Sequence, residues 1–478
     1  MLASNTGWRF VAFAARTVGG LVATILVARV LGPREFGRFG FALALTLLLS
    51  FLVMLGLPKL LVRELARRPH DAGRLLDSAL LVAFAAGAVV SVLLLAVGGA
   101  LGAETALLGM VGLALVGDAG ARIVTSLFWA SERMRYEAAS VGAQEVAFVA
   151  LTLLALGTDA GVEGVMLAYV TSRAIGFVVA WWFAAWRFRL RVLPRPHAGG
   201  VRPIVRATTP FAIDDALSLA YVRIDAVLLG IFHGPTAVGL YGSATNLVLN
   251  LNVLPRMLNM SVYPRMSRAW PDRPDELRRL RDAALRILGA IAMPIAVGAF
   301  VLAPRIVDLV YGPGFERAAV FLRLLAVIVP FRMLGNTLGT ALTSADRQTS
   351  RAFVVGVAAG VNLLLNLALI PIWSIHGAIA STIVTEIGLF VAYAVLLRRV
   401  TGRSSLVSSV VVPGIACVPL AIVAAAMPSA PVLVAVGVAG AAYVVALATL
   451  VLATMPRPTV RPRALVGSFL AFDRVGTG

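Results

Sequence analysis

Fourteen long apolar segments recur along the chain, separated by short polar connections. Each has close to the ~20 residues that a helix needs to cross the hydrocarbon core of a bilayer. No other open structure satisfies its backbone hydrogen bonds in lipid. The sequence therefore predicts an all-α polytopic membrane protein with about 14 transmembrane helices. The predicted spans are roughly 7–31, 38–62, 75–99, 106–130, 138–157, 163–186, 209–232, 237–262, 284–310, 318–343, 351–371, 375–397, 406–427 and 431–454.

The composition agrees with this pattern. Of 478 residues, 60% are hydrophobic and only 14% are charged, whereas an average soluble domain has roughly 25% charged residues. So much apolar surface cannot face water without aggregation. These values argue against a soluble enzyme, a nucleic-acid-binding protein and a disordered chain. The single cysteine, Cys417, excludes an intrachain disulfide.

The basic residues are distributed unevenly between the two sides of the predicted helices. Of 42 Lys and Arg residues, 29 lie on one side of the predicted helices, in the C-terminal tail or at the connections that follow even-numbered spans. Only five lie at the connections on the opposite side, and the other eight lie inside spans or at their ends. Positive residues accumulate on the cytoplasmic side of a membrane protein. The pattern predicts that both termini are cytoplasmic, and it assigns the net charge of +19 to membrane topology rather than to a nucleic-acid partner.

The first and seventh spans are followed by similar turns. Gly32, Pro33, Gly37, Gly40 and Ala42 recur 202 residues later as Gly234, Pro235, Gly239, Gly242 and Ala244. A Gly-Pro pair is also a common turn between helices, but five identities in eleven positions favour an internal repeat. Six spans is an even number, so the two copies are parallel, as in many secondary transporters. The predicted domains are an N-lobe at 1–197, a C-lobe at 198–403, and an accessory helix pair with a cytoplasmic tail at 404–478.

No catalytic or metal-binding motif accompanies these spans. A P-loop needs Gly-Lys-Ser/Thr, but Lys59, the only lysine, follows Pro58. The four histidines are scattered without metal-ligand spacing. The outer connections are only a few residues long and leave no room for the acidic catalytic residues of a membrane glycosyltransferase or polymerase. The sequence therefore predicts a protein that is not an enzyme and has no cofactor.

Six arginines lie well inside predicted spans, where an ionised side chain costs roughly 2.5–3.5 kcal/mol. They are Arg16, Arg122, Arg173, Arg223, Arg256 and Arg332. Arg122 follows Asp118 by four residues, the favoured order for an ion pair along a helix. The others lack such a local partner, and we expect them to line a cationic cavity, since arginine binds phosphate oxygens in a bidentate manner. The competing interpretation is that acids on neighbouring helices neutralise them.

One pair of charges relates the two halves of the chain. Arg173 in the sixth span and Glu386 in the twelfth occupy equivalent positions of the repeat to within one residue. Opposite charges at such positions are suited to face each other across the central axis. A gate made by these two residues is therefore one arrangement that the repeat allows.

Several short motifs occur in a characteristic order. They are Ala28-Arg29-Val30-Leu31-Gly32-Pro33-Arg34-Glu35-Phe36-Gly37, Pro210-Phe211, Arg223-Ile224-Asp225-Ala226-Val227-Leu228-Leu229-Gly230, Gly239-Leu240-Tyr241, Tyr263-Pro264-Arg265, Tyr311-Gly312-Pro313-Gly314-Phe315, and Asn362 to Asn366 before Ile370-Pro371. In this order and spacing the chain resembles the polysaccharide-exporter branch of the multidrug/oligosaccharidyl-lipid/polysaccharide exporter superfamily. The resemblance covers about residues 1–400 and becomes featureless in the last two spans.

The resemblance implies a flippase of the Wzx type. Such proteins move undecaprenyl-pyrophosphate-linked oligosaccharides from the cytoplasmic to the outer leaflet of the bacterial inner membrane, by alternating access between two lobes. The implied partners are the lipid-linked oligosaccharide, membrane lipids, and the polymerase and glycosyltransferases of the same pathway. The pyrophosphate of such a lipid fits the expected cationic cavity.

The resemblance also implies roles for individual residues. Related lipid II flippases bind the pyrophosphate with arginines that include one in span 1 and one in span 8, and Arg16 and Arg256 occupy comparable places. Those relatives also have a sodium site built from spans 7, 11 and 12. Its counterparts by position are Asp225, Asn362, Asn366 and Thr382. The relatives have a carboxylate where Asn366 stands, so H⁺ coupling through Asp225 is an alternative to Na⁺ coupling, and Glu386 is a further candidate.

Two other functions stay open on the sequence alone. A cation-coupled multidrug exporter of the same superfamily usually has twelve spans and an acidic or neutral cavity, unlike the arginine surplus here. A membrane glycosyltransferase or polymerase of the same pathway would need longer outer connections. Asn362 and Asn366, which lie one helical turn apart, serve equally well as hydrogen-bonding groups between helices.

Overall fold

The structure, a computed structural model, describes residues 2–100, 104–190, 192–195, 202–402 and 405–454. It describes only the backbone of residues 2–4, 6, 202–205, 207, 210, 211, 213, 214, 217, 218, 220 and 454. The predicted boundary between the lobes at 197/198 and the predicted tail beyond residue 454 lie outside the described residues. All eleven candidate site residues lie inside them.

The described residues form helices joined by short connections. The helices are α1 (Leu2–Met54), α2 (Leu57–Arg67), α3 (Ala72–Ala100), α4 (Thr105–Ala130), α5 (Met134–Gly157), α6 (Gly161–Phe188), α7 (Arg202–Asn250), α8 (Val253–Ala269), α9 (Pro274–Val301), α10 (Ala303–Tyr311), α11 (Ala318–Ala326), α12 (Ile328–Ser344), α13 (Gln348–Trp373), α14 (Ile375–Thr401), α15 (Leu406–Ala426) and α16 (Val432–Thr454), with a 3₁₀ turn, η1 (Pro69–Asp71), before α3. No strand occurs in these ranges, and the predicted all-α fold class is confirmed.

Eleven helical segments are long and apolar enough to cross a membrane, or twelve if α11 and α12, bent by 43°, form one broken span. Two of the eleven contain a kink, at Gly32 (φ 76°, ψ 178°) and at Gly234 (φ 76°, ψ −179°). Glycine adopts such angles at much lower cost than other residues do. Each of the two kinked segments covers two predicted spans. With their two arms counted separately and α11–α12 counted as one span, the segments correspond in order to the fourteen predicted spans.

Some predicted spans are interrupted in the structure. The segments 38–62, 237–262 and 284–310, each expected to be one helix, break at Leu55-Gly56, at 251–252 and at Leu302. Leu55 and Gly56 both have positive φ, which is incompatible with a continuous right-handed helix. Hydropathy reports burial in lipid and not backbone angles, so the apolar pattern did not reveal these breaks.

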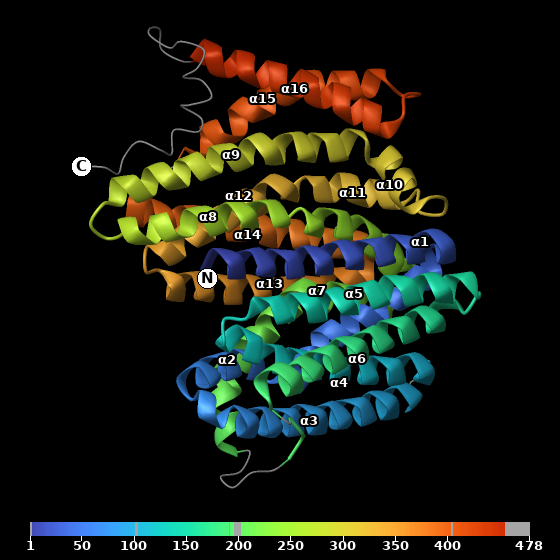
Figure 1. The fold of residues 1–478 in the computed structure, drawn as a ribbon. Helices are drawn as coiled ribbons and strands as arrows, with labels where there is room; N and C mark the ends of the chain where they lie inside the picture. The colour runs from blue at the N-terminus through green and yellow to red at the C-terminus, as the bar shows by residue number, and fades with distance from the viewer. Residues whose placement is uncertain (1, 101–103, 191, 196–201, 403–404, 455–478) are drawn as a thin grey trace.

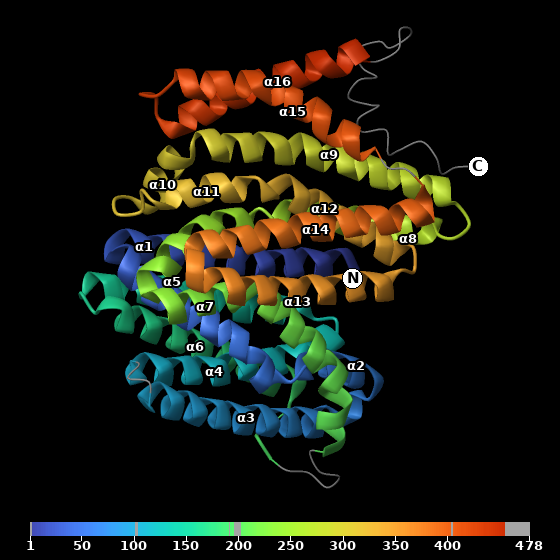
Figure 2. The same cartoon turned by 180° about the vertical axis from the view of Figure 1, so that it is seen from behind.

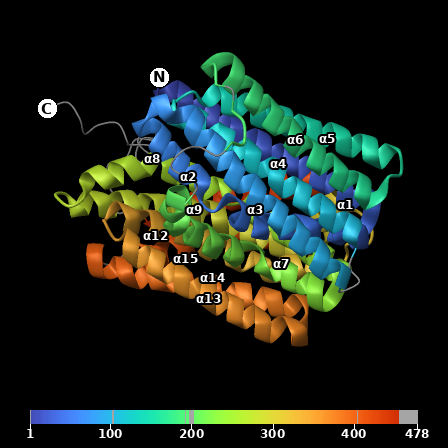
Figure 3. The ribbon, with the colours of Figure 1, turned by 90° about the horizontal axis from the view of Figure 1, so that it is seen from below.

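The helices form two groups with a separate pair outside them (Figure 1). We call α1–α6 the N-lobe and α7–α14 the C-lobe. The pair α15 and α16 forms an outer layer beside α9 (Figure 2). From below, α5 and α6 lie towards one edge of the molecule, and α13 and α14 lie at the other (Figure 3). The accessory pair thus packs on the C-lobe.

The two lobes approach each other most closely where α1 and α7 cross, just beyond their kinks. A Cβ atom on Gly37 would overlap the carbonyl oxygen of Pro235, and a Cβ atom on Gly239 would overlap that of Pro33. The two contacts are reciprocal, because each glycine faces the proline of the other repeat. This glycine crossing, made by Gly37 and Gly239, gives the internal repeat a structural counterpart.

Side chains of the C-lobe also cover the N-lobe kink at this end. Phe36 packs against Tyr311 and Phe315, with ring centroids 6.3 Å and 5.9 Å apart. Arg29 donates a hydrogen bond to the carbonyl oxygen of Val310 over 2.8 Å, in the last turn of α10, where the helix dipole favours a cation. These contacts close the interface between the lobes beside the kinks.

Candidate functional site

A cavity lies between the lobes, extending from the N-terminal part of α1 towards the glycine crossing. Its wide part, about 740 Å³, is lined by α1, α4, α5 and α8 and includes Arg16 and Arg256. A narrower part of about 210 Å³ runs between α1 and α7, includes Arg16 and Arg223, and reaches Phe36. Arg16 lines both parts. We call the two parts together the arginine cavity.

Three predicted binding residues line this cavity without an acidic partner. Among the described side chains, Arg16, Arg223 and Arg256 form no ion pair. Arg16 belongs to the N-lobe, and the other two belong to the C-lobe. Arg256 lies over the ring of Phe13, 5.4 Å from its centroid, a favourable contact that leaves its charge unneutralised. The arrangement suits an anion with several negative oxygens, held between the lobes.

The other three predicted arginines are neutralised inside their own lobes. The pairs are Arg122–Asp118 at 2.9 Å, Arg173–Glu145 at 3.2 Å and Arg332–Glu386 at 3.4 Å. The first joins residues one helical turn apart, as the sequence predicted. The other two join neighbouring helices. For these three arginines the structure therefore supports the competing interpretation, in which acids cancel the charge.

The gate expected between Arg173 and Glu386 is not formed. Arg173 is buried and pairs with Glu145 in the N-lobe. Glu386 pairs with Arg332 and accepts a hydrogen bond from the Tyr221 hydroxyl over 3.1 Å, in the C-lobe. Each charge finds its partner on a neighbouring helix of the same lobe. Which acid pairs with which arginine depends on which helices are neighbours in space, and a repeat in the sequence does not specify that.

Asp225, the first candidate for ion coupling, lies on α7 beside two side chains of the C-lobe. It accepts a hydrogen bond from the hydroxyl of Tyr241, and Tyr241 also interacts with the side chain of Thr382. The positions 202 residues before Asp225 and Tyr241 are Ala23 and Phe39, which are buried and apolar. The carboxylate and its tyrosine are therefore a property of the C-lobe alone.

Asn362 and Asn366 form a second polar group in the C-lobe. Asn366 donates to Asn362 over 2.9 Å, and Asn362 donates to Thr385 over 3.2 Å. The Oδ1 atom of Asn366 is buried and has no hydrogen-bond partner among the residues that the structure describes. Buried polar atoms are normally satisfied, so this oxygen is free to contact a water molecule or a cation. In the described ranges no group of three or more His, Cys, Asp or Glu residues could hold a metal ion.

Two family models match the chain, each over more than half of its length. The model described as a polysaccharide biosynthesis protein matches residues 2–270. The chain belongs to this family. The model of the lipid II flippase MurJ matches residues 187–451, so the two matches together extend over nearly all of the helical part. The predicted membership of the flippase branch of the superfamily is confirmed, and with its apolar helices the chain is a multi-pass membrane protein.

Individual relatives agree with this assignment. The probable flippase AglR of Haloferax volcanii is 26% identical over 177 residues, which are 36% of this chain and 37% of that protein. The chain thus matches little more than a third of the length of this curated relative. The lipid II flippase MurJ in an inward closed conformation has a TM-score of 0.73 at 12% identity, covering 92% of this chain and 97% of that chain.

A more distant structure has the same general architecture. An inward-facing MATE family multidrug resistance transporter has a TM-score of 0.62 at 16% identity, covering 80% of this chain and 94% of that chain. At identities this low, both structural similarities show a shared fold. The choice between a lipid and a drug as cargo must come from the residues of the cavity.

Several residues of the arginine cavity were not identified from the sequence. Arg9, Trp129 and Glu137 line its wide part, and Asn246 lines its narrow part. Arg9 lies over the Trp129 ring, 4.6 Å from its centroid. It precedes Arg16 by seven residues, which places both on one helix face, and this spacing could have revealed it. Trp129 and Glu137 lie near helix ends, where aromatic and polar residues are common.

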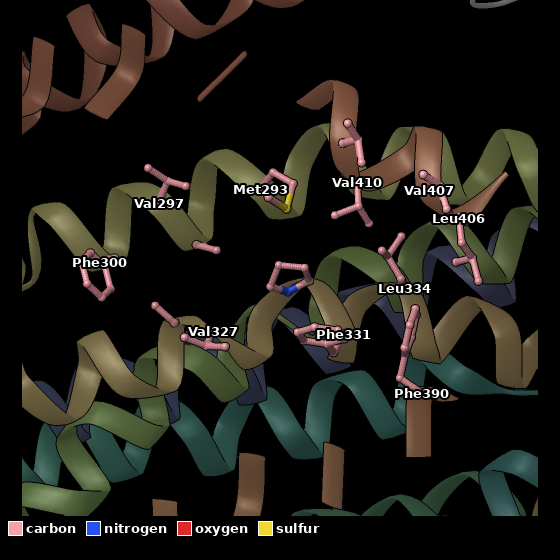
Figure 4. Close-up of a pocket in the computed structure, with 14 residues that line it drawn as sticks. Met293, Val297, Phe300, Val327, Phe331, Leu334, Phe390, Leu406, Val407 and Val410 are labelled. Carbon is pink, nitrogen blue, oxygen red and sulfur yellow. The ribbon is translucent and has the colours of Figure 1, made fainter. Parts of the chain in front are cut away.

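A second hollow, about 540 Å³, lies between α9, the α11–α12 pair, α14 and α15 (Figure 4). The side chains that line it are all apolar and include Met293, Val297, Phe331, Phe390 and Val407. None of its lining residues is shared with the arginine cavity. Without a polar group it accommodates a hydrocarbon chain but does not select a charged headgroup, so the arginine cavity is the candidate binding site.

Proposed function

We propose that the protein is a flippase without covalent chemistry. It moves an oligosaccharide linked to undecaprenyl pyrophosphate from the cytoplasmic to the outer leaflet of a bacterial inner membrane, by alternating access. One observation carries this proposal: Arg16, Arg223 and Arg256, which form no ion pair with a described side chain, line a cavity between two lobes. Membership of a polysaccharide biosynthesis family supports the class of cargo.

The positions of the arginines link cargo binding to movement of the lobes. A pyrophosphate placed beside Arg16 is attracted to the N-lobe through that residue and to the C-lobe through Arg223 and Arg256. The bound anion also offsets the mutual repulsion of these cations, which is strong where water is scarce. A ligand shifts a conformational equilibrium by its difference in affinity for the two states. Pyrophosphate therefore favours a state in which both lobes contact it.

The rest of such a cargo also fits the surroundings. The wide part of the arginine cavity, about 740 Å³, lies within the range of about 300–1,000 Å³ found for small-molecule sites. It leaves room for sugar next to the pyrophosphate. The prenyl chain stays in the hydrocarbon region, where the apolar hollow of about 540 Å³ offers one surface for it. The pyrophosphate, the sugar and the prenyl chain of one cargo molecule are thus each matched by a different environment: the arginines, the open space of the cavity and the apolar surface.

We further propose that entry of Na⁺ or H⁺ at the C-lobe drives transport through Asp225. The Asp225–Tyr241 pair has no equivalent in the N-lobe, and the Oδ1 atom of Asn366 is free to contact a cation. With Asp225→Asn, we expect transport to lose its acceleration by a sodium or proton gradient, while binding of polyprenyl pyrophosphate persists. Equal acceleration of the variant and the wild-type protein would exclude this role.

The glycolipid pool of a strain that lacks the protein tests the main proposal. Polyprenyl-linked glycans are separated by electrophoresis and identified by mass spectrometry. We expect undecaprenyl-pyrophosphate oligosaccharide to accumulate on the cytoplasmic side and the surface polymer to disappear. An unchanged pool with normal polymer would contradict the proposal. Increased sensitivity to cationic drugs would then favour the multidrug exporter, and sugar transfer by the purified protein would favour an enzyme.

A further inference from the structure

Glu137, in the first turn of α5, is an acid inside a cavity whose other charged residues are arginines. It lines the wide part of the arginine cavity together with Arg9, Arg16 and Arg256. The residue is only 9% exposed. Its Oε2 atom is buried and has no hydrogen-bond partner in the described part of the chain. No motif in the sequence points to this residue, and the transport mechanism proposed above does not use it.

The surroundings of the carboxylate are aromatic and cationic. Trp129 lines the same part of the cavity as Glu137. Arg9 lies over the Trp129 ring, 4.6 Å from its centroid.

A purely structural role does not account for this arrangement. Two other acids inside helices of the N-lobe, Asp118 and Glu145, form ion pairs with arginines at 2.9 Å and 3.2 Å. Glu137 interacts electrostatically with Arg9 and Arg16 but forms no ion pair with any described side chain. A buried carboxylate oxygen without a donor is costly. A group that binds in the cavity and brings a hydrogen-bond donor would remove this cost.

The chemistry of the cargo identifies that donor. The oxygens of a pyrophosphate are acceptors and carry negative charge, so a carboxylate repels them. Sugar hydroxyls and the amide N–H of an acetamido sugar are donors. Since Arg16 and Arg256 line the same space, the group within reach of Glu137 is the part of the cargo next to the phosphates. The arginines thus bind the pyrophosphate of the headgroup, and the carboxylate binds the adjoining sugar.

We propose that Glu137 accepts a hydrogen bond from the sugar that is joined directly to the pyrophosphate. It makes this flippase selective for glycosylated over bare lipid pyrophosphate. This inference rests on the proposed function and deepens it, because it assigns the recognition of the first sugar to one residue. Bare carrier lipid, which lacks the donor, does not form this bond with the carboxylate and binds less well.

Binding to the purified full-length protein in lipid nanodiscs tests the inference. The probes are polyprenyl pyrophosphate and the same lipid carrying glucose or N-acetylglucosamine. The variants are Glu137→Gln, which keeps the side-chain volume, and Glu132→Gln as the matched control. Glu132 is exposed, lies just beyond α4 at the same end of the molecule, and does not line the cavity. Thermal unfolding of each variant shows that it is folded.

Glu137→Gln should change the affinity for the two kinds of probe differently. With Glu137→Gln, affinity for the sugar-bearing lipid that the wild-type protein prefers falls about tenfold or more, as for loss of a hydrogen bond to a charged group. Affinity for bare polyprenyl pyrophosphate stays the same or rises, because a negative charge near the arginines has been removed. Glu132→Gln changes neither affinity.

The outcomes separate this inference from the proposed function. If the wild-type protein binds all three lipids equally, or if Glu137→Gln weakens all of them to the same extent, the role of Glu137 is wrong and the flippase stands. If the wild-type protein binds none of the lipids, the arginine cavity is not a pyrophosphate site, and both proposals fall. Only a loss confined to the glycosylated lipid supports recognition of the sugar.

Discussion

Arg173 and Arg256 show two ways in which a guanidinium is accommodated inside this protein. Arg173 is buried and lies 3.2 Å from Glu145. Arg256 is exposed to the cavity and contacts the face of Phe13. Removal of one partner of a buried ion pair leaves the other charge uncompensated. Removal of a cavity arginine takes away only an attraction for cargo, so the two positions should respond differently to the same substitution.

We predict that Arg173→Gln destabilises the fold, whereas Arg256→Gln impairs transport and leaves the fold intact. Loss of Arg173 should lower the free energy of unfolding by about 3–5 kcal/mol, the cost of a broken buried pair. Loss of Arg256 should change it by less than about 0.5 kcal/mol, as for a surface substitution. Unfolding in detergent and cargo translocation measure the two effects. Normal transport by Arg256→Gln would show that this residue does not bind cargo.

The residue scale is also where sequence reasoning succeeds only in part. Arg16, Arg223 and Arg256 were predicted because an arginine in an apolar segment without a local acid is costly and therefore conspicuous. Arg332 meets the same criterion, yet Glu386 of another helix neutralises it at 3.4 Å. Contacts between helices depend on how each helix is rotated and inclined. The pattern along one helix does not contain that information.

At the scale of elements, the kinks of α1 and α7 determine where the lobes touch. Gly32 and Gly234 have nearly the same backbone angles, and each redirects its helix towards the other lobe. The glycine crossing that follows leaves no space for a side chain on Gly37 or Gly239. Alternating access requires this crossing to separate, so it is the natural place to control the conformation of the protein.

We predict that Gly239→Ala shifts the protein towards a state in which the crossing is open. The added Cβ would overlap the backbone of Pro33, which cannot rotate away as a flexible side chain does. Spin labels on Arg34→Cys and Thr236→Cys, in a Cys417→Ser background, report the separation of the two turns. We expect a larger population at long distance than in the parent protein.

Gly242→Ala is the matched control for this experiment. It lies one helical turn further along α7, and a Cβ atom there would meet no atom within 4 Å. Its distance distribution should equal that of the parent protein. If Gly239→Ala also leaves the distribution unchanged, the crossing does not hold the lobes together.

The order of the helices could be predicted from the sequence, but their interruptions could not. Apolar length is enough to place a span, because lipid demands it. The breaks at Leu55-Gly56 and at Leu302 occur within continuous apolar sequence. The Gly-Pro repeat was visible as a motif. Its consequence, that Gly37 and Gly239 lie against each other's prolines, depends on packing between segments 202 residues apart.

At the scale of the whole molecule, the lobes are joined on both sides of the arginine cavity. The glycine crossing closes one end. Towards the other end, Lys59 of α2 lies 2.7 Å from Asp215 of α7. The two side chains are 45% and 28% exposed, and an exposed ion pair contributes little to stability. The Lys59–Asp215 contact should therefore be the easier of the two to break.

We predict that Lys59→Glu favours separation of the lobes on this side, because it places like charges together. Exposed pairs contribute roughly 0.2–1 kcal/mol, so the ratio of closed to open molecules should fall by only about 1.4- to fivefold. The double variant Lys59→Glu with Asp215→Lys should recover much of it. Distances between spin labels on α2 and α7 measure the change. A double variant that behaves like Lys59→Glu would rule out this contact as a link between the lobes.

The most direct test of the central claim, that the arginine cavity carries a lipid pyrophosphate, is translocation by the purified protein in proteoliposomes. The cargo is a fluorescent polyprenyl-pyrophosphoryl disaccharide, and its arrival in the opposite leaflet is followed by quenching. We expect translocation by the wild-type protein and by Arg398→Gln, an exposed control at the end of α14. For Arg16→Gln, which loses a charge-assisted contact to phosphate, we expect a rate at least about tenfold lower. Translocation by Arg16→Gln at the wild-type rate would show that the arginine cavity does not carry the lipid pyrophosphate.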